Sequence, residues 1–157
     1  EIGREVATRS KAMGMEVLYY QRTRLPADIE AESEATYVSY EKLFEASDFI
    51  SIHLPLNAST EGMVDTASFA RMKPGAIIAN ISRAQIIDRD ALIAALDSGH
   101  LGGAGLDVHY AEPGDPKEPL KNYRNVVLSP HVAVAQRLHN MADIAELVAN
   151  LTEALGG

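Results

Sequence analysis

The segment from Gly75 to Glu112 constrains the fold more than any other part of this 157-residue sequence. It contains an apolar run that ends at Arg83, a helical pattern from Asp88 to Ser98, and a second apolar run that ends at Asp107. Two buried strands joined by a crossover helix form a βαβ unit with parallel strands. Because ligands of open α/β sheets bind beyond the carboxyl ends of the strands, the sequence predicts that Arg83 and Asp107 face one site.

Strands and helices alternate along the rest of the chain as well. Strand-like runs lie at 16–20, 36–38, 48–54 and 126–128, and helical patterns lie at 1–15, after Ser39, at 65–72 and from Val134 onward. Most strands are continuous apolar runs, which is typical of a parallel sheet with both faces covered. The sequence therefore predicts a doubly wound α/β fold. Residues 113–123, rich in Pro, Lys and Asn, are predicted to form a surface loop.

Composition argues against several kinds of partner. Hydrophobic residues make up 46% of the chain and charged residues 23%, which suits one globular domain with a sizeable core. The net charge of -8, without any run of Lys and Arg, argues against nucleic acid. Because there is no cysteine, disulfides and thiolate metal sites are excluded, and we expect no metal. Since no signal peptide or bilayer-length apolar run is present, we expect a cytoplasmic protein without a membrane partner.

An ordered set of short motifs runs along the chain. The motifs are Leu54-Pro55-Leu56, Met72-Lys73-Pro74-Gly75-Ala76, Asn80-Ile81-Ser82-Arg83, Ala104-Gly105-Leu106-Asp107-Val108, Glu112-Pro113 and Ser129-Pro130-His131. In order and spacing they resemble the cofactor domain of the D-2-hydroxyacid dehydrogenase family. Glu1-Ile2-Gly3 resembles the last part of the G-x-G-x-x-G fingerprint. The resemblance implies that residues 1–157 are a partial, Rossmann-like dinucleotide-binding domain, with a central first strand before residue 1 and the substrate-binding domain absent from this chain.

The resemblance assigns catalytic roles to Arg83, Glu112 and His131, and their chemistry suits the reaction. Reduction of a 2-oxo acid by hydride transfer leaves negative charge on the carbonyl oxygen. Arg83 can bind the substrate carboxylate in a bidentate manner, which lysine could not imitate. His131 is the candidate proton donor, and Glu112 would hydrogen-bond its imidazole and favour the charged form. Without the surrounding motifs, surface ion pairs and a structural histidine would be the simpler interpretation.

Cofactor contacts are expected at several strand ends. The expected positions are Glu1, Ile2, Gly3, Gln21, Arg22, Thr23, Arg24, His53, Leu54, Pro55, Ile81, Ser82, Arg83, Asp107, His131 and Ala133. His53 is expected to line the adenine pocket with Leu54 and Pro55. By resemblance, Asp107 lies near the nicotinamide carboxamide, and its alternative role is a strand-end cap. The role of His109 is left open.

The residue that follows the strand predicted at 16–20, which is the second strand of the family's domain by resemblance, distinguishes a site for NADP from a site for NAD. A site that prefers NAD carries Asp or Glu there, which holds the ribose 2′-hydroxyl and repels a 2′-phosphate. Here Gln21 occupies the position, and Arg22 and Arg24 follow it. A neutral residue beside two guanidinium groups favours the phosphate, so we expect NADP in preference to NAD. The alternative is a solvated basic loop with no preference.

Two positions depart from the family pattern. Ala84 stands where many members have glycine after the arginine, and Ala133 stands where glycine often follows the histidine. If the backbone at Ala84 required a positive φ, alanine would be strained there. Neither departure removes a catalytic group, but the two leave open which 2-oxo acid is used.

The expected function is that of an NAD(P)-dependent oxidoreductase acting on a small 2-oxo acid such as glyoxylate or hydroxypyruvate, as a homodimer. Phosphoglycerate and phosphonate dehydrogenases of the same family are alternatives, whereas Glu112 speaks against formate dehydrogenase. A corepressor-like protein that binds the dinucleotide as a sensor is an alternative from another class, because such proteins can retain the three catalytic residues.

Overall fold

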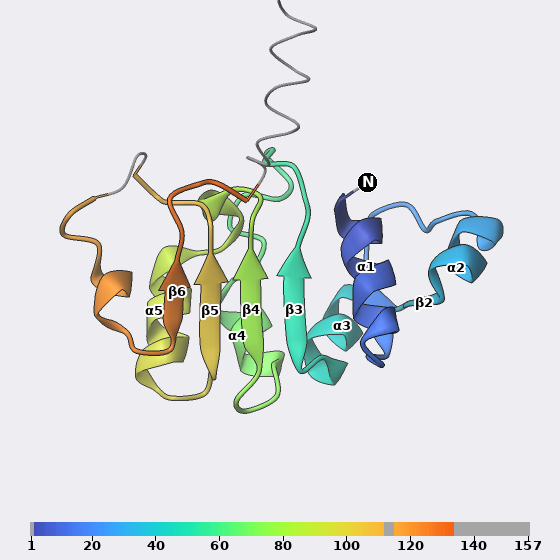
Figure 1. The fold of residues 1–157 in the computed structure, drawn as a ribbon. Coiled ribbons are helices and arrows are strands. Elements are labelled where there is room, and N and C mark those ends of the chain that lie inside the picture. The colour runs from blue at the N-terminus through green and yellow to red at the C-terminus, as the bar shows by residue number, and fades with distance from the viewer. Residues whose placement is uncertain (1, 112–114, 134–157) are drawn as a thin grey trace, which may run out of the picture.

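The computed structural model describes residues 2–111 and 115–133. Glu112, for which a catalytic role is predicted, and the helix predicted from Val134 onward lie outside these ranges. Its helices are α1 (Ile2–Ala12), α2 (Ala27–Ser33), α3 (Tyr40–Ala46), α4 (Thr66–Arg71) and α5 (Arg89–Asp97), with 3-10 helices η1 (Ala84–Ile86) and η2 (Pro119–Asn122). Its strands are β1 (Val17–Tyr19), β2 (Ala35–Tyr37), β3 (Phe49–Ile52), β4 (Ile77–Asn80), β5 (Gly103–Leu106) and β6 (Val126–Leu128), as Figure 1 shows.

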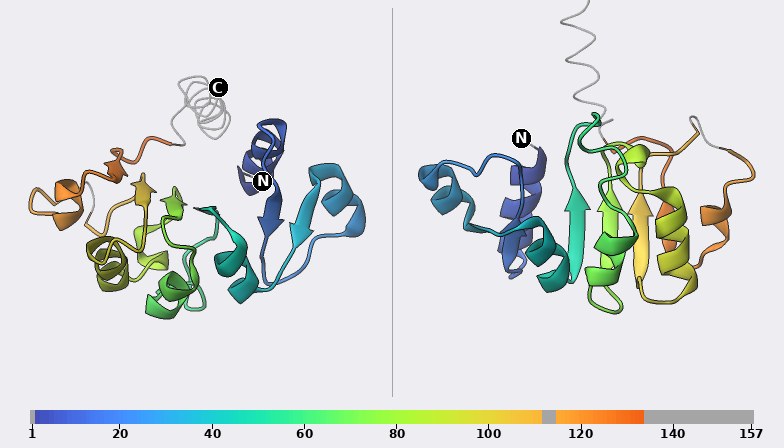
Figure 2. Two further views of the ribbon diagram at one scale, coloured as in Figure 1. Left: turned by 90° about the horizontal axis from the view of Figure 1, so that it is seen from below. Right: turned by 180° about the vertical axis from the view of Figure 1, so that it is seen from behind.

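All the strand pairs among the described residues are parallel. Strands β3, β4, β5 and β6 form a four-stranded sheet in that order, while β1 and β2 form a separate two-stranded sheet. Helices α4 and α5 lie on one face of the four-stranded sheet (Figure 2). This alternation confirms the predicted Rossmann-like class, although the sheet is divided into two parts.

Side-chain caps determine where three helices begin. Ser39, Asp65 and Asp88 each accept a hydrogen bond from the backbone N–H three residues further on. Such caps satisfy N–H groups that have no partner within the helix. These helices therefore start where the sequence predicts. By contrast, the sequence analysis predicts no helix at the position of α2. This helix has only seven residues, and Pro26 at its N-cap position makes no capping hydrogen bond, so the sequence carries no signal for its start.

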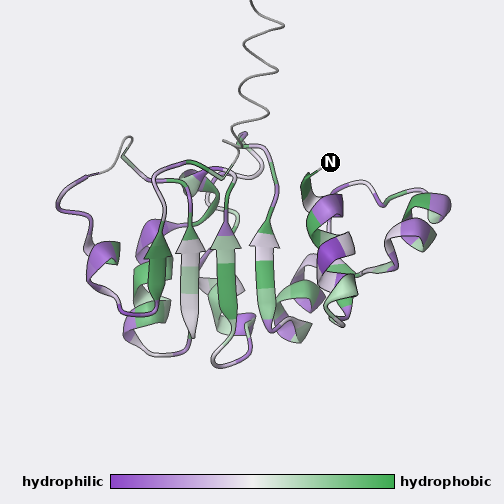
Figure 3. Ribbon diagram, viewed as in Figure 1, coloured by the Kyte–Doolittle hydropathy of each residue, from purple (hydrophilic) through white to green (hydrophobic). Residues whose placement is uncertain are grey.

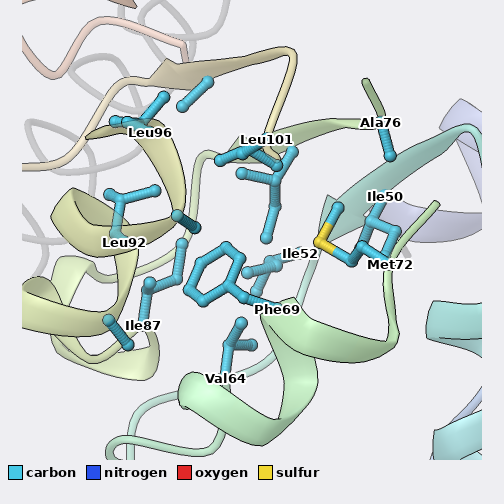
Figure 4. Packing of buried hydrophobic residues seen from close by; sticks show 14 of the residues in the cluster. Ile50, Ile52, Val64, Phe69, Met72, Ala76, Ile87, Leu92, Leu96 and Leu101 are labelled. Carbon is cyan, nitrogen blue, oxygen red and sulfur yellow. The ribbon is translucent and has the colours of Figure 1, made fainter. Parts of the chain in front are cut away.

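The core lies between the four-stranded sheet and helices α4 and α5 (Figure 4). Ile50 and Ile52 point into it from β3, and Phe69 and Leu92 contact it from the two helices. The most hydrophobic stretches of the sheet lie along β4 and β6 (Figure 3). Ile78 of β4 and Leu92 are fully buried, which contributes about 1.5–3 kcal/mol for each side chain. This packing fixes the strands whose ends form the site.

The other face of the four-stranded sheet differs from the prediction. Burial alternates along β3, and Phe49 is 61% exposed. Val127, on β6, is 70% exposed. Within the described residues, therefore, helices cover one face of these outer strands and not both.

The segment before β6 is also less exposed than predicted. Leu120, in η2, is only 2% exposed and belongs to the core. Glu118 is 8% exposed and accepts a hydrogen bond of 3.0 Å from Arg89 at the start of α5. The prediction of a surface loop is wrong for this part, because one leucine and one ion pair anchor it to the body of the domain.

Candidate active site

The site lies where four parallel strands end side by side. The register pairs Ile52 with Asn80, Asn80 with Leu106, and Leu106 with Leu128, so these residues form one row. The residues that follow the row are His53, Ile81, Asp107 and Ser129. Arg83 and His131 lie two residues beyond members of this second row. The structure thus brings the predicted strand-end residues to one edge of the sheet.

A fully buried asparagine shapes the turn that carries Arg83. The Asn80 side-chain oxygen accepts a hydrogen bond from the Ser82 backbone N–H, and its amide nitrogen donates to the Arg83 carbonyl, both at 2.9 Å. The Ser82 hydroxyl donates to the Ile52 carbonyl at 2.9 Å and so ties the turn to β3. The Arg83 side chain is exposed and donates to the Ser82 carbonyl at 2.6 Å. This role of Asn80 was not predicted, because its only signal in the sequence is a polar residue at the end of an apolar strand.

A buried carboxylate shapes the turn that carries His131. Asp107 is 3% exposed, and its two oxygens accept hydrogen bonds from the Ser129 hydroxyl and from the backbone N–H groups of Val132 at 2.9 Å and Ala133 at 2.7 Å. Between these donors, His131 has a φ of 56°, in the left-handed region. Non-glycine residues enter that region at a cost of roughly 1–2 kcal/mol. Asp107 therefore holds a turn that the backbone alone would not favour.

The environment keeps Asp107 ionised. Burial opposes the charged form, but the hydrogen bonds from Ser129, Ala133 and Val132, with the nearby His131, outweigh burial and lower the pKa of Asp107. His109 binds the same turn, because its Nε2 lies 2.9 Å from the Ser129 carbonyl oxygen. These contacts correspond to the strand-end cap that the sequence left as the alternative role of Asp107.

We predict that Asp107→Asn lowers the free energy of unfolding of the full-length protein by about 2 kcal/mol near neutral pH, because an amide cannot accept from all three donors. The folded pKa of Asp107 is lowered, so its contribution is present above the unfolded value of about 3.9 and is lost as pH falls through the folded pKa. Urea unfolding from pH 3 to 7 should show the difference from wild type shrinking in acid. Asp48→Asn, in which an exposed carboxylate loses its pairing with Lys73, should cost less than about 1 kcal/mol. An equal cost for both variants would contradict the anchoring role.

A cavity of about 280 Å³ opens where α1 begins. It is lined by Ile2, Gly3, His53, Ile81 and Ser82, five of the residues expected to contact the cofactor. A Cβ on Gly3 would lie 3.4 Å from that of His53, so glycine permits the close approach. Burial lowers the pKa of His53, and its Nδ1 is buried without a hydrogen-bond partner among the described residues.

These features fit part of a nicotinamide dinucleotide. The first N–H groups of α1 are unpaired within the helix and favour an anion such as a pyrophosphate. The cavity does not include Leu54, which packs against the core, or Pro55. Glu1 lies outside the described residues, as does Glu112, so the predicted contact between Glu112 and His131 is not described.

The two alanines that replace family glycines cause no strain. Among the described residues other than glycine, positive φ values occur only at Glu34 and His131. Ala84 begins η1 and is buried. Ala133 donates its N–H to Asp107. The backbone strain considered for Ala84 is therefore absent, and the positive φ in this part of the site is found at His131 instead.

Parallel strands, a site at their carboxyl ends and a cavity at a helix start define a Rossmann-type dinucleotide-binding domain. The family model "D-isomer specific 2-hydroxyacid dehydrogenase, NAD binding domain" matches residues 1–133. The chain belongs to this family, and its cofactor is a nicotinamide dinucleotide.

Similar proteins agree with this assignment. The chain is 45% identical to a glyoxylate reductase of Korarchaeum cryptofilum over 94% of its length and 44% of that protein. It is 38% identical to a hydroxypyruvate reductase of Thermotoga maritima, over 99% of the chain and 50% of the relative. The crystal structure of a glyoxylate reductase from Paecilomyes thermophila matches with a TM-score of 0.87 and 37% identity, covering 99% of this chain and 46% of that one. The chain thus spans about half the length of these relatives or less.

The described residues contain no helix with the length and apolar character needed to cross a bilayer.

Proposed function

We propose that this chain is the cofactor-binding domain of an NAD(P)-dependent D-2-hydroxyacid dehydrogenase that reduces a small 2-oxo acid such as glyoxylate or hydroxypyruvate. The observation that carries the proposal is the convergence of the Arg83 turn, the Asp107-held His131 turn and the cavity beside Gly3 at one sheet edge. The names of the relatives, glyoxylate reductase and hydroxypyruvate reductase, support the choice of substrate class.

Each residue has a separate task in this reaction. When bound, the reduced nicotinamide supplies the hydride. Arg83 binds the substrate carboxylate through two parallel N–H groups, which orients the carbonyl carbon. His131 gives a proton to the carbonyl oxygen as negative charge develops there. Asn80 and Asp107 are positioning residues, because each holds the turn that carries one of these groups. Glu112 is proposed to orient the imidazole of His131.

The surrounding architecture is part of the proposal. We propose that residues 1–157 are part of a dinucleotide-binding domain, and that a strand preceding residue 1 and followed by G-x-G joins the two-stranded and four-stranded sheets. A separate domain would supply most of the substrate specificity. We further propose a cytoplasmic homodimer, on the family resemblance. NADP is proposed as the preferred cofactor because Gln21, rather than a carboxylate, stands two residues beyond Tyr19, where β1 ends.

The test is oxidation of NADPH and NADH by the full-length protein with a panel of oxo acids. We expect turnover with glyoxylate or hydroxypyruvate, faster with NADPH at equal low concentration. Preference for phosphohydroxypyruvate would favour the phosphoglycerate dehydrogenase alternative, and reduction of NADP⁺ or NAD⁺ by phosphite would favour the phosphonate dehydrogenase alternative. Dinucleotide binding without turnover of any substrate would contradict the enzyme proposal and favour the corepressor-like alternative.

A further inference from the structure

The loop between β1 and α2 carries both arginines expected near the 2′ position of the cofactor, but one of them is already engaged. Arg24 donates from Nε and Nη2 to the two carboxylate oxygens of Glu30, each at 2.8 Å. A bidentate arginine–carboxylate pair of this kind is stronger and geometrically more restrictive than a single contact. The loop lies at the edge of the molecule to which the ends of β3–β6 also point (Figure 1).

Glu30 is itself held in place. The Tyr19 hydroxyl donates to its carboxylate and accepts a hydrogen bond of 3.0 Å from the Leu25 N–H, and the Glu30 side chain is only 14% exposed. The hydrogen bonds from Arg24 and then Tyr19 lower the pKa of Glu30 to about 2, so the pair stays ionised near neutrality. The Arg24 guanidinium also lies over the Tyr37 ring, 5.4 Å from its centroid. Two hydrogen bonds to Glu30 of α2 and one contact with Tyr37 of β2 therefore hold the arginine, while Tyr19 of β1 holds Glu30.

Arg22 makes none of these contacts. Its side chain is exposed, as that of Arg24 is, but it makes no hydrogen bond, ion pair or ring contact with the described residues. Gln21, beside it, donates its side-chain amide to the Thr23 carbonyl. The sequence predicts two available guanidinium groups, those of Arg22 and Arg24. In the structure the carboxylate of Glu30 on α2 binds Arg24, so only Arg22 of the two is left without such a pairing.

We propose that Glu30 sets the cofactor preference of this protein by withholding the Arg24 guanidinium from the 2′-phosphate of NADP, which leaves Arg22 as the arginine available to it. The inference rests on the dinucleotide site of the proposed function and adds a residue that controls its selectivity. Glu30 is a positioning residue in this scheme, since it acts through Arg24 and need not touch the cofactor. NADP preference is then weaker than the two arginines of the sequence suggest.

Helix α2 offers a matched control for this idea. Glu32 lies on the same helix and carries the same charge, but it pairs with Arg4 of α1 at 3.0 Å rather than with the β1 loop. Replacing either glutamate by glutamine removes one negative charge from α2. Only Glu30→Gln, however, releases Arg24. Comparison of the two variants therefore separates the effect of losing one negative charge on α2 from the effect of releasing the Arg24 guanidinium.

The experiment measures dissociation constants of NADPH and NADH by fluorescence titration of the full-length protein, without substrate. We expect Glu30→Gln to raise the affinity for NADPH about threefold to tenfold at low salt, with little change for NADH, as suits one added and partly solvated charge-assisted contact. The gain should decrease with salt, because the contact is exposed. Glu32→Gln should leave the NADPH/NADH affinity ratio within about twofold of wild type.

Two further variants make the outcome decisive even if Glu30→Gln proves unstable. In the wild-type background, Arg24→Gln should leave NADPH affinity unchanged, while Arg22→Gln should reduce it at least threefold. Added to Glu30→Gln, Arg24→Gln should abolish the gain. Loss of NADPH affinity from Arg24→Gln alone would overturn the proposal, as would an unchanged ratio in a folded Glu30→Gln. Failure of either dinucleotide to bind would instead overturn the proposed function, so the two failures are distinguishable.

Discussion

Replacing His131 by glutamine is expected to lower kcat for reduction of the 2-oxo acid by about 10²–10⁴, the usual contribution of a positioned general acid. Glutamine can still donate a hydrogen bond, but it cannot transfer a proton to the developing alkoxide. The dissociation constant for the dinucleotide should change little, because Asp107 binds the backbone N–H groups of residues 132 and 133 whatever the side chain at 131. Steady-state kinetics and cofactor titration together test both statements.

The left-handed conformation of His131 calls for a second variant. Its φ of 56° is one that asparagine adopts more readily than glutamine, so His131→Asn separates backbone strain from lost chemistry. Both variants should lose activity to a similar extent. A recovery of activity in His131→Asn would mean that the glutamine variant fails because the turn is distorted.

His109 is the neighbouring imidazole that could compete for the role. Its Nε2 is engaged with the Ser129 carbonyl oxygen at 2.9 Å, which suits a structural contact to the turn. We expect His109→Gln to retain activity within about tenfold of wild type, because an amide can keep this hydrogen bond. If His109→Gln caused the larger loss, the assignment of His131 as proton donor would be wrong.

Much of this fold follows from local sequence rules. Asp65 and Asp88 cap helices where the sequence places them, and the βαβ unit around Arg83 and Asp107 forms as its apolar runs predict. These elements are predictable because caps and apolar periodicity act over a few residues. Helix α2 lacks such a cap and is not predicted.

Features that depend on distant residues were not predictable in the same way. The conformation of His131 is imposed by Asp107, 24 positions earlier, and the availability of Arg24 is decided by Glu30 on the next helix. In each case the sequence drew attention to the residue but not to the partner that determines its conformation or its contacts. Opposite charges are common in any loop and helix, so the sequence does not determine which pair forms.

The candidate cofactor site was likewise predictable only in part. Gly3, His53 and Ser82 were grouped by family resemblance, and the cavity beside α1 brings them together. Asn80 was seen only as part of a motif, although its side chain makes both hydrogen bonds that form the Arg83 turn. A buried amide satisfied by the backbone leaves no distinctive sequence signal beyond one polar residue at a strand end.

Arg83→Lys is expected to lower kcat/KM for the 2-oxo acid by about 10- to 100-fold, the equivalent of one to two charge-assisted hydrogen bonds. Lysine keeps the positive charge but presents a point donor in place of the planar fork that matches a carboxylate. Cofactor affinity should be unchanged. Arg89→Lys is the matched control, because Arg89 forms an ion pair with Glu118 in the body of the domain and should affect stability more than catalysis.

The division of the effect between kcat and KM distinguishes two roles for Arg83. If the guanidinium only binds the carboxylate, KM rises and kcat is preserved; if it also aligns the carbonyl for hydride transfer, kcat falls too. We expect both to change, because the turn closed by Asn80 holds the Arg83 backbone in a fixed orientation beside β4. Guanidinium added to Arg83→Ala should then restore part of the activity, whereas ammonium of equal concentration should not. Equal rescue by both cations would show that charge alone, rather than bidentate geometry, is what this position provides.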